Sequence, residues 1–397
     1  MQLLYISYWG LNDPLTISSV MPTLPALKGQ LGLDRLTLVT VERRGARYPR
    51  YDIPYDFVDH IPIEPRAQGS GLLTKAYEMF LMPRKIERIC VEERIDLIFA
   101  RCSLAGTIAC RIHERTGIPF IVESFEPHAD YMVNCGTWAK GGWKYRFARK
   151  FEKRQMVGAR MLITVARSYR DYLETVECVE PSRLAVIPCV TDLDQTRFEP
   201  ERREALRKEL GLGDAVTGVY AGKFGDLYYD DEAFRIMRDA FEYFPEFRMV
   251  LLTPTGPEHI RDRITEHGIP EDRVHVRLVP RRDVPGYLSA ADFAYSFHRP
   301  NPFSRFLCPI KHGEYWACGL PFIVPDGVSD DSEVIVNEGG GAVLYPSLTN
   351  LRDCHEAIAR IVAKPDYRAS IRQLAVRHKG VNIIHDVFSE IFGPPSD

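Results

Sequence analysis

The sequence predicts an α/β protein with two doubly wound domains that face each other across a cleft. Three observations lead to this prediction. The chain has 397 residues, which is too long for one ordinary hydrophobic core. Short apolar runs alternate with longer amphipathic stretches, as in strand–helix units that build parallel sheets. The alternation starts again in the second half, so each half is expected to form its own sheet.

The first half contains six apolar runs that we predict to be strands. Several are apolar throughout, as expected where helices cover both faces of a sheet. The segments Leu72–Glu93 and Ser103–Thr116 are predicted to be helices between them. The predicted strands are QLLYIS, LTLVTVE, FVDHIPI, IDLIFAR, PFIVES and MLITVA.

The second half repeats the pattern after a segment rich in Pro, Asp and Thr, VIPCVTDLDQTRFEPERRE, which we interpret as a linker. The boundaries that follow are residues 1–195 for the first domain and 196–378 for the second. Doubly wound domains bind ligands outside the carboxyl ends of their strands, so the cleft between the two is the expected site. The predicted strands are VTGVYAG, RMVLLTP, VHVRLVP, FAYSFH, PFIVP and GAVLYP, and the predicted helices are Asp230–Tyr243, Pro257–His267, Val284–Ala291 and Leu351–Ala363.

The composition excludes several classes of function. A formal net charge of −3 gives no global field for nucleic acid, so no nucleic-acid partner is expected. The nine cysteines form no CxxC pair and lack zinc-finger spacing, which favours reduced thiols in the cytoplasm and no metal site. The N-terminus has no basic n-region, and no window approaches the ~20 apolar residues of a spanning helix. A place at the inner face of the membrane stays open.

The stretch CPIKHGEYWACGLPFIVP places a lysine and a glutamate one helical turn apart near a helix N-terminus. The free amides of a helix N-terminus suit a phosphate, and Lys311 adds a compact positive charge. Glu314 can accept hydrogen bonds from the two hydroxyl groups of a ribose. A nucleotide site is one interpretation of this pair. The other is an ordinary surface ion pair, which contributes less than ~1 kcal/mol.

Several motifs resemble those of GT-B-fold glycosyltransferases, specifically the family 4-like (group 1-like) enzymes with a PxKxxEYxAxGxP variant. PIKHGEYWACGLPFIV resembles their donor-site signature, and VIPCVTDLDQTRF resembles the segment that opens their second domain. VYAGKFG and SDDSEVIVNEGGGAVLY resemble two phosphate-side segments of that domain. FEKRQMVGARMLITVARSYRDYL resembles the end of their first domain. The resemblance implies two Rossmann-like domains and a final helix, residues 379–397, that crosses back to the first.

The resemblance also implies roles for residues of the second domain. Glu314 would bind the ribose of a nucleotide diphosphate sugar, which is the donor substrate, with no further cofactor. Lys311 and Lys223, beside Gly222, would neutralise the diphosphate leaving group, so that no metal is required. Asp331 and Ser332 would lie near the phosphates or the donor sugar. Independently of the resemblance, His298 and Arg299 end another predicted strand of the second domain, in YSFHRPNPFSR, and are expected to approach the donor sugar.

The sequence departs from the family pattern at two places. Many retaining members carry two glutamates in an E-x7-E pattern, and the first of these falls here on Phe306. The second basic residue that follows the Gly-Lys pair is also missing, because GKFGDLYYDDE supplies Asp226, Asp230 and Asp231 instead. The resemblance therefore predicts a sugar-nucleotide site but leaves retention or inversion of configuration open.

Candidate catalytic residues lie after strands of the first domain. Glu126 and His128, in PFIVESFEPHADYM, are the leading pair for a general base that takes the proton of an acceptor hydroxyl. A helix cap in a solvated loop is the structural alternative. Asp13 lies on the loop after the first strand and is either a site residue or a turn residue before Pro14. Arg101 is expected to hold an anionic acceptor or to pair with a carboxylate.

The basic aromatic stretch WAKGGWKYRFARKFEKR has two interpretations. Related enzymes with lipid-linked acceptors use such patches to contact anionic membranes. Trp143, Phe147 and Phe151, however, recur at i, i+4 and i+8, as in an amphipathic helix whose aromatic stripe faces the core. The basic residues are Lys140, Lys144, Arg146, Arg149, Lys150, Lys153 and Arg154.

The favoured function is transfer of a sugar from a nucleotide diphosphate sugar to a hydroxyl of a glycan or lipid-linked glycan. Two alternatives stay open. A catalytically silent protein would bind the nucleotide sugar without transfer. A sugar-nucleotide epimerase on the same fold would act without an acceptor.

Overall fold

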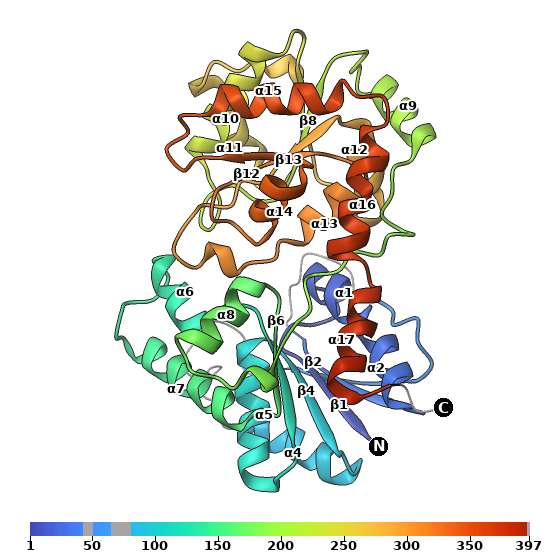
Figure 1. Cartoon of the computed structure of the whole chain (residues 1–397), viewed down its shortest axis with the longest axis vertical. Helices are drawn as coiled ribbons and strands as arrows, with labels where there is room; N and C mark the ends of the chain where they lie inside the picture. The colour runs from blue at the N-terminus through green and yellow to red at the C-terminus, as the bar shows by residue number, and fades with distance from the viewer. Residues whose placement is uncertain (43–50, 65–80, 395–397) are drawn as a thin grey trace. The chain divides into compact units, whose positions relative to one another are not determined.

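The computed structural model describes residues 1–42, 51–64 and 81–394. The chain divides into two compact units (Figure 1). Unit 1 comprises Met1–Val190 and Val381–Asp397, and unit 2 comprises Thr191–Gly380. The part of the predicted helix Leu72–Glu93 that precedes residue 81 lies outside the described residues.

Unit 1 contains a parallel sheet that has seven strands within the described residues, in the order β3-β2-β1-β4-β5-β6-β7. Strands β2 and β3 are added on one side of β1, and strands β4 to β7 are added on its other side, which is the doubly wound arrangement. All of β1, β2, β4 and β5 is buried, which explains their largely apolar sequences. The strands are β1 Leu3–Ser7, β2 Leu36–Val41, β3 Val58–Ile63, β4 Leu97–Arg101, β5 Phe120–Ser124, β6 Met161–Thr164 and β7 Leu184–Val186.

Helices of unit 1 pack on this sheet (Figure 1). The C-terminal helix α17 lies against α2, where the Gln30 side chain donates a hydrogen bond to the carbonyl oxygen of Gly393 at 2.5 Å. The helices are α1 Pro14–Val20, α2 Thr23–Leu31, α4 Met82–Glu92, α5 Cys102–Thr116, α6 His128–Asn134, α7 Trp143–Gly158, α8 Arg167–Thr175 and α17 Asn382–Phe392.

Unit 2 repeats the architecture with a six-stranded parallel sheet in the order β10-β9-β8-β11-β12-β13. The order in which strands are added to the sheet reverses between β8 and β11. The loops after these two strands therefore flank the ligand-binding position of a doubly wound sheet. The α/β fold with two Rossmann-like sheets that the sequence predicts is confirmed. The strands are β8 Thr217–Ala221, β9 Arg248–Leu252, β10 Val274–Arg277, β11 Phe293–Tyr295, β12 Phe322–Pro325 and β13 Gly341–Leu344.

Helices of unit 2 cover two separate apolar cores. One is rich in Phe and Tyr and includes Phe234 and Tyr295, and the other is built around Trp316. The helices are α9 Pro200–Glu209, α10 Asp231–Tyr243, α11 Pro257–Glu266, α12 Val284–Ala290, α13 Ile310–Ala317, α14 Asp331–Glu338, α15 Leu351–Val362 and α16 Tyr367–Lys379, with short 3-10 turns η4 Arg281–Asp283 and η5 Ser304–Phe306.

The two ends of unit 2 are paired with each other. Thr191 and Gly380 form a parallel bridge, and the Thr191 amide donates to the Lys379 carbonyl at 2.7 Å. Gly313 of α13 lies directly beside this pair, and a Cβ at position 313 would come within 2.3 Å of Thr191 Oγ1. The segment interpreted from the sequence as a linker therefore begins within a structured region, since β7 precedes it and Thr191 is hydrogen-bonded.

Candidate active site

Lys311 stands in the second position of α13 and reaches the turn after β8. A Cβ at position 222 would lie 2.6 Å from Lys311 Nζ and 2.6 Å from the Tyr220 hydroxyl. Only glycine leaves room for this approach. The backbone near this turn is held by Tyr315, whose hydroxyl accepts a hydrogen bond from the Ala221 amide at 3.1 Å. The structure thus brings together the predicted residues Gly222 and Lys311.

The ammonium group of Lys311 is buried and has no hydrogen-bond partner in the described part of the chain. It lies 4.7 Å from the ring centroids of both Tyr220 and Tyr228, which offer only the weak attraction of their aromatic faces. Burial lowers the pKa of Lys311 to about 7, although the charge of Glu314 acts in the opposite direction. A buried cation without a partner is costly, and an anionic ligand at this position would remove the cost.

Glu314 does not pair with Lys311 in the described structure. Its Oε1 accepts a hydrogen bond from Arg281 Nη2 at 2.7 Å, and the glutamate is buried. The surface ion pair considered from the sequence is therefore absent among the described residues. Arg281 belongs to η4, which follows β10. The only feature of the sequence that could have drawn attention to Arg281 is the pair of adjacent arginines in VPRRD.

His298 and Arg299 follow β11 and point to different surroundings. His298 is buried, its ring centroid lies 4.6 Å from that of Tyr228, and its Nδ1 is 3.2 Å from Ser296 Oγ. Arg299 is exposed and donates to Glu232 Oε1 at 3.0 Å. The structure therefore places His298 beside the residues around Lys311, and it pairs Arg299 with α10.

Asp331 and Ser332 begin α14 and are both buried. Asp331 Oδ1 pairs with Lys379 Nζ at 2.7 Å, and its Oδ2 is 2.8 Å from His312 Nδ1. Ser332 donates to the Ser329 carbonyl at 3.0 Å. Sequence reasoning missed His312 and Lys379 because their partners lie at distant positions in the chain.

Lys223 and Phe306 complete the predicted residues of unit 2. Lys223 is exposed in the turn after β8, and its carbonyl oxygen accepts the Tyr220 hydroxyl at 2.5 Å. Phe306, where the family pattern places a glutamate, is buried in η5 with its ring 5.9 Å from that of Phe303. An apolar side chain thus occupies this position.

In unit 1, Glu126 and His128 form the pair that the sequence proposed. Glu126 Oε1 lies 2.9 Å from His128 Nδ1, and the histidine ring packs edge-on against Trp138. Burial acts to lower the pKa of His128, but the hydrogen bond and charge of Glu126 outweigh it and raise the pKa above its ordinary value.

A further carboxylate, Glu152, lies close enough to His128 for their charges to interact, and it was not proposed from the sequence. Its Oε1 accepts the Ala129 amide at 2.9 Å, at the start of α6. Burial raises the pKa of Glu152 to about 7, against the effects of Ala129, His128 and Arg149. The helix-capping role that we considered for this loop is therefore taken by Glu152, while Glu126 and His128 bond to each other.

Asp13 and Arg101 occupy separate places in unit 1. The Asp13 amide donates to the Gly10 carbonyl at 3.1 Å within the turn after β1. Arg101 is buried and donates to Glu123 Oε2 at 2.7 Å, and the same oxygen accepts the Tyr5 hydroxyl at 2.8 Å. Of the two roles considered for Arg101, the structure shows pairing with a carboxylate.

Helix α7 carries the basic aromatic stretch. Phe151 is buried and its ring contacts Phe147 at 4.7 Å, but Trp143 is 59% exposed. The aromatic stripe thus faces the core only in its C-terminal part. Within the described residues no helix is long and apolar enough to cross a membrane.

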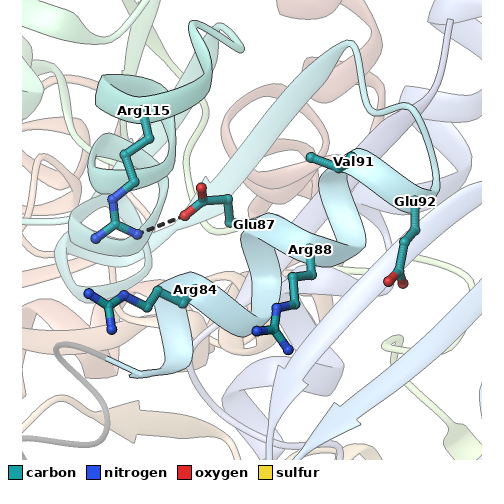
Figure 2. A pocket seen from close by; sticks show the side chains of 6 residues that line it. All are labelled: Arg84, Glu87, Arg88, Val91, Glu92 and Arg115. Carbon is teal, nitrogen blue, oxygen red and sulfur yellow. Dashed lines mark hydrogen bonds and ion pairs between the residues drawn. The ribbon is translucent and has the colours of Figure 1, made fainter.

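An open hollow lies on α4 and α5 of unit 1. Figure 2 shows its lining, in which Arg115 donates to Glu87 at 2.7 Å. None of the predicted site residues lines it. Among the described residues, no group of three or more His, Cys, Asp or Glu side chains is placed to hold a metal ion.

The chain is similar to known proteins both in sequence and in fold. Residues 29–189 match the family described as a glycosyl transferase 4-like domain. The solved structure of HepE from Anabaena in complex with UDP-glucose aligns with a TM-score of 0.71 and 14% identity over 98% of each chain. The fold is that of the GT-B glycosyltransferases. WaaG, a glycosyltransferase involved in lipopolysaccharide biosynthesis, aligns with a TM-score of 0.70 and 13% identity over 98% of this chain and 100% of WaaG.

A curated relative matches part of the chain. The D-inositol 3-phosphate glycosyltransferase of Streptomyces scabiei is 27% identical over 168 residues, which is 41% of this chain and 36% of that protein. The chain thus spans about a third of this relative's length. The resemblance to GT-B glycosyltransferases that we inferred from the sequence motifs is confirmed by the fold and by the domain family of residues 29–189.

Proposed function

We propose that the protein transfers a sugar from a nucleotide diphosphate sugar to a hydroxyl group of a glycan or lipid-linked glycan. The observation that carries this proposal is the buried ammonium of Lys311, which lies beside the glycine turn after β8 and has no hydrogen-bond partner among the described residues. It provides a place for the negative charge of a diphosphate. UDP and UDP-glucose, which HepE binds in its solved structures, are the first ligands to test.

The residues of unit 2 would stabilise the leaving group. As the bond between the sugar C1 and the phosphate oxygen breaks, negative charge grows on the diphosphate, and Lys311 and the exposed Lys223 would neutralise it. Glu314 would accept hydrogen bonds from the ribose hydroxyls, with Arg281 holding its carboxylate in place. Asp331 and Ser332 are proposed to act near the phosphates.

The residues of unit 1 would serve the acceptor. As the acceptor oxygen bonds to the sugar C1, its proton would pass to Glu126 or His128, which share one hydrogen bond. Asp13 is proposed as a further acceptor-side residue. Since Lys311 and Lys223 supply the positive charge, transfer is expected to persist in the presence of EDTA.

A thermal-shift screen against nucleoside diphosphates and their sugar conjugates tests the donor site. A ligand that binds only the folded state raises the free energy of unfolding, by about 2.7 kcal/mol at a hundredfold excess over Kd. Glu314→Ala is expected to weaken UDP binding about 10- to 100-fold and to abolish transfer. The matched control is Glu356→Ala, an exposed glutamate of α15. Wild-type UDP affinity in the Glu314 variant would remove this residue from the site.

Product analysis separates the three functions. A transferase releases UDP in proportion to glycosylated acceptor, an epimerase converts the donor sugar without acceptor, and a silent binding protein does neither.

Peripheral contact with an anionic membrane is part of this proposal. It is supported by the exposed Trp143 at the start of α7, whose ring lies 5.9 Å from Lys144 Nζ, and by the exposed basic residues Lys140, Arg146 and Lys150. Trp143→Ala is expected to reduce co-sedimentation with vesicles that contain phosphatidylglycerol. Val157→Ala, at the other end of α7 and 81% exposed, is the control. Equal sedimentation of both variants would contradict the membrane contact.

A further inference from the structure

Five polar side chains of unit 2 form a continuous chain of hydrogen bonds that ends at His298, close to the candidate donor site around Lys311. It runs from Lys379 to Asp331 at 2.7 Å, to His312 at 2.8 Å, to Ser296 at 2.7 Å and to His298 at 3.2 Å. All five residues are buried. We call this chain of hydrogen bonds the relay. Its members come from α16, α14, α13 and the segment that follows β11.

The direction of the hydrogen bonds is set at Asp331. Lys379 donates to its Oδ1, and Ser329 donates to its Oδ2 at 3.0 Å. Although burial favours the neutral acid, the charge of Lys379 and the contact with His312 hold the pKa of Asp331 well below its ordinary range. An ionised carboxylate only accepts hydrogen bonds. His312 must therefore carry its hydrogen on Nδ1 and donate it to Asp331.

The direction of the next two hydrogen bonds is set at His312 and Ser296. Burial lowers the pKa of His312 despite the opposing effect of Asp331, so that the ring is neutral and its Nε2 is a bare acceptor. Ser296 donates its single hydroxyl hydrogen to that Nε2. Its oxygen can then only accept from His298 Nδ1, so His298 carries its hydrogen there. Burial and the charges of Lys311 and His312 lower the pKa of His298, which also favours the neutral ring.

We propose that the relay fixes His298 in the tautomer with a bare Nε2, and that this nitrogen accepts a hydrogen bond from a hydroxyl group of the ligand. His298 thereby becomes a specificity residue, and His312 and Ser296 are positioning residues. A bare nitrogen repels a phosphate oxygen, so His298 and Lys311 divide the ligand between them. Lys311 takes the anion, and His298 takes a neutral hydroxyl, which under the proposed function belongs to the sugar.

The location of His298 supports this division. Its ring lies 4.6 Å from the Tyr228 ring, whose centroid is 4.7 Å from Lys311 Nζ. Within the described residues the hydrogen bond of His298 is made through Nδ1, which leaves Nε2 for the ligand. An acceptor thus lies one aromatic ring away from the ammonium group of Lys311, which has no hydrogen-bond partner in the part of the chain that the structure describes.

The tautomer is measured in the ligand-free protein by NMR of ¹⁵N-labelled histidine, with the His298 signals identified by their loss in His298→Gln. We expect His298 to show a protonated Nδ1 and an unprotonated Nε2. Ser296→Ala interrupts the relay and should give averaged signals for two exchanging tautomers. Ser289→Ala, another fully buried serine of unit 2, should leave the His298 signals unchanged.

Asp331→Asn provides a sharper test, because it should reverse the direction. Lys379 would keep the asparagine oxygen, so the amide NH₂ would donate to His312 Nδ1. The hydrogen would then move to Nε2 in both His312 and His298. If this variant fails to fold, Ser296→Ala alone decides the tautomer.

Binding measurements test the role of the bare nitrogen. Ser296→Ala is expected to weaken UDP-glucose binding about three- to tenfold, the effect of one hydrogen bond, and to leave UDP binding unchanged. Wild-type His298 signals in Ser296→Ala, a protonated Nε2 in the wild type, or equal losses for both ligands would overturn the proposal. If neither ligand binds the wild type, the proposed function fails for these donors, while the NMR spectra still decide the tautomer.

Discussion

Two buried cations at the carboxyl ends of parallel strands make an instructive comparison. Arg101 ends β4 in unit 1, and Lys311 lies beside the turn after β8 in unit 2. Arg101 donates to Glu123 at 2.7 Å, and this carboxylate also accepts the Tyr5 hydroxyl. Lys311 Nζ has only the faces of Tyr220 and Tyr228 and no hydrogen-bond partner in the described residues.

This difference separates a structural cation from a binding cation. Burial alone would lower the pKa of Arg101, but Glu123 and Tyr5 raise it above its ordinary value. For Lys311 burial prevails, and the pKa falls to about 7. The carboxylate of Glu123 therefore neutralises the charge of Arg101 within the protein. For Lys311 we expect a bound anionic ligand to do so. Variants at these two positions test this contrast.

Replacing Arg101 by Met should destabilise the protein strongly. Removal of one partner leaves Glu123 as an uncompensated buried charge, which costs about 3–5 kcal/mol in the free energy of unfolding. Urea denaturation of the variant and the wild type measures this loss. The double variant Arg101→Met with Glu123→Met should recover more than half of it, since both charges are then gone. An Arg101→Met protein as stable as the wild type would show that the pair is not structural.

Replacing Lys311 by Met should have the opposite sign. The folded protein no longer holds a desolvated amine, so the free energy of unfolding at pH 7 should rise by roughly 1–3 kcal/mol. The gain should fade between pH 7 and about 10, because there the folded state already holds a neutral lysine and the unfolded chain loses its proton too. UDP binding should weaken about 10- to 100-fold at pH 7.

Lys208→Met, at an exposed position of α9, is the control and should change neither quantity. A Lys311 variant that is less stable than the wild type would indicate a structural role like that of Arg101. Denaturation and titration calorimetry on the same samples provide both measurements.

The sequence predicted most of the fold because strands and helices leave local periodic patterns. Helices Pro257–Glu266 and Leu351–Val362 lie within one residue of their predicted ends. Strand β7, Leu184–Val186, was missed because three residues are too few to show an alternating pattern. Its assignment came only from pairing with β6.

The candidate site was predicted only in part. Motifs drew attention to Lys311 and Glu314, which are close in sequence. The sequence could not show that Glu314 bonds to Arg281, 33 positions away, instead of to Lys311. His312 and Lys379 were missed for the same reason, since both contact the carboxylate of Asp331, which lies in a separate segment. Whether a charge is paired is a property of tertiary structure, and no local pattern records it.

The smallest expected effect, about tenfold in UDP affinity between pH 7.5 and 8.5, is a pH dependence of nucleotide binding that distinguishes Lys311 from a fully paired cation. A bound diphosphate would return the pKa of Lys311 towards its ordinary value of about 10.4. Binding between pH 7 and 10 would then take up one proton, because the empty site holds a neutral amine.

The groups whose charge acts on Lys311 do not confuse this measurement. Glu314 is bonded to Arg281, and the pKa of His298 and that of His312 both lie below their ordinary value, mainly because of burial. Burial raises the pKa of Tyr220 and that of Tyr228, which keeps both phenols neutral over this range.

Free UDP is fully ionised above about pH 7, so in that range its affinity should fall about tenfold per pH unit as Lys311 loses its proton in the empty site. Calorimetry at pH 8 in HEPES and in Tris, which differ in ionisation enthalpy, should report uptake of about one proton. Lys311→Met should show neither the slope nor the uptake, since the titrating group is absent. Equal UDP affinity of the wild type at pH 7.5 and 8.5 would mean that Lys311 is charged in the empty site, and the contrast with Arg101 would then be lost.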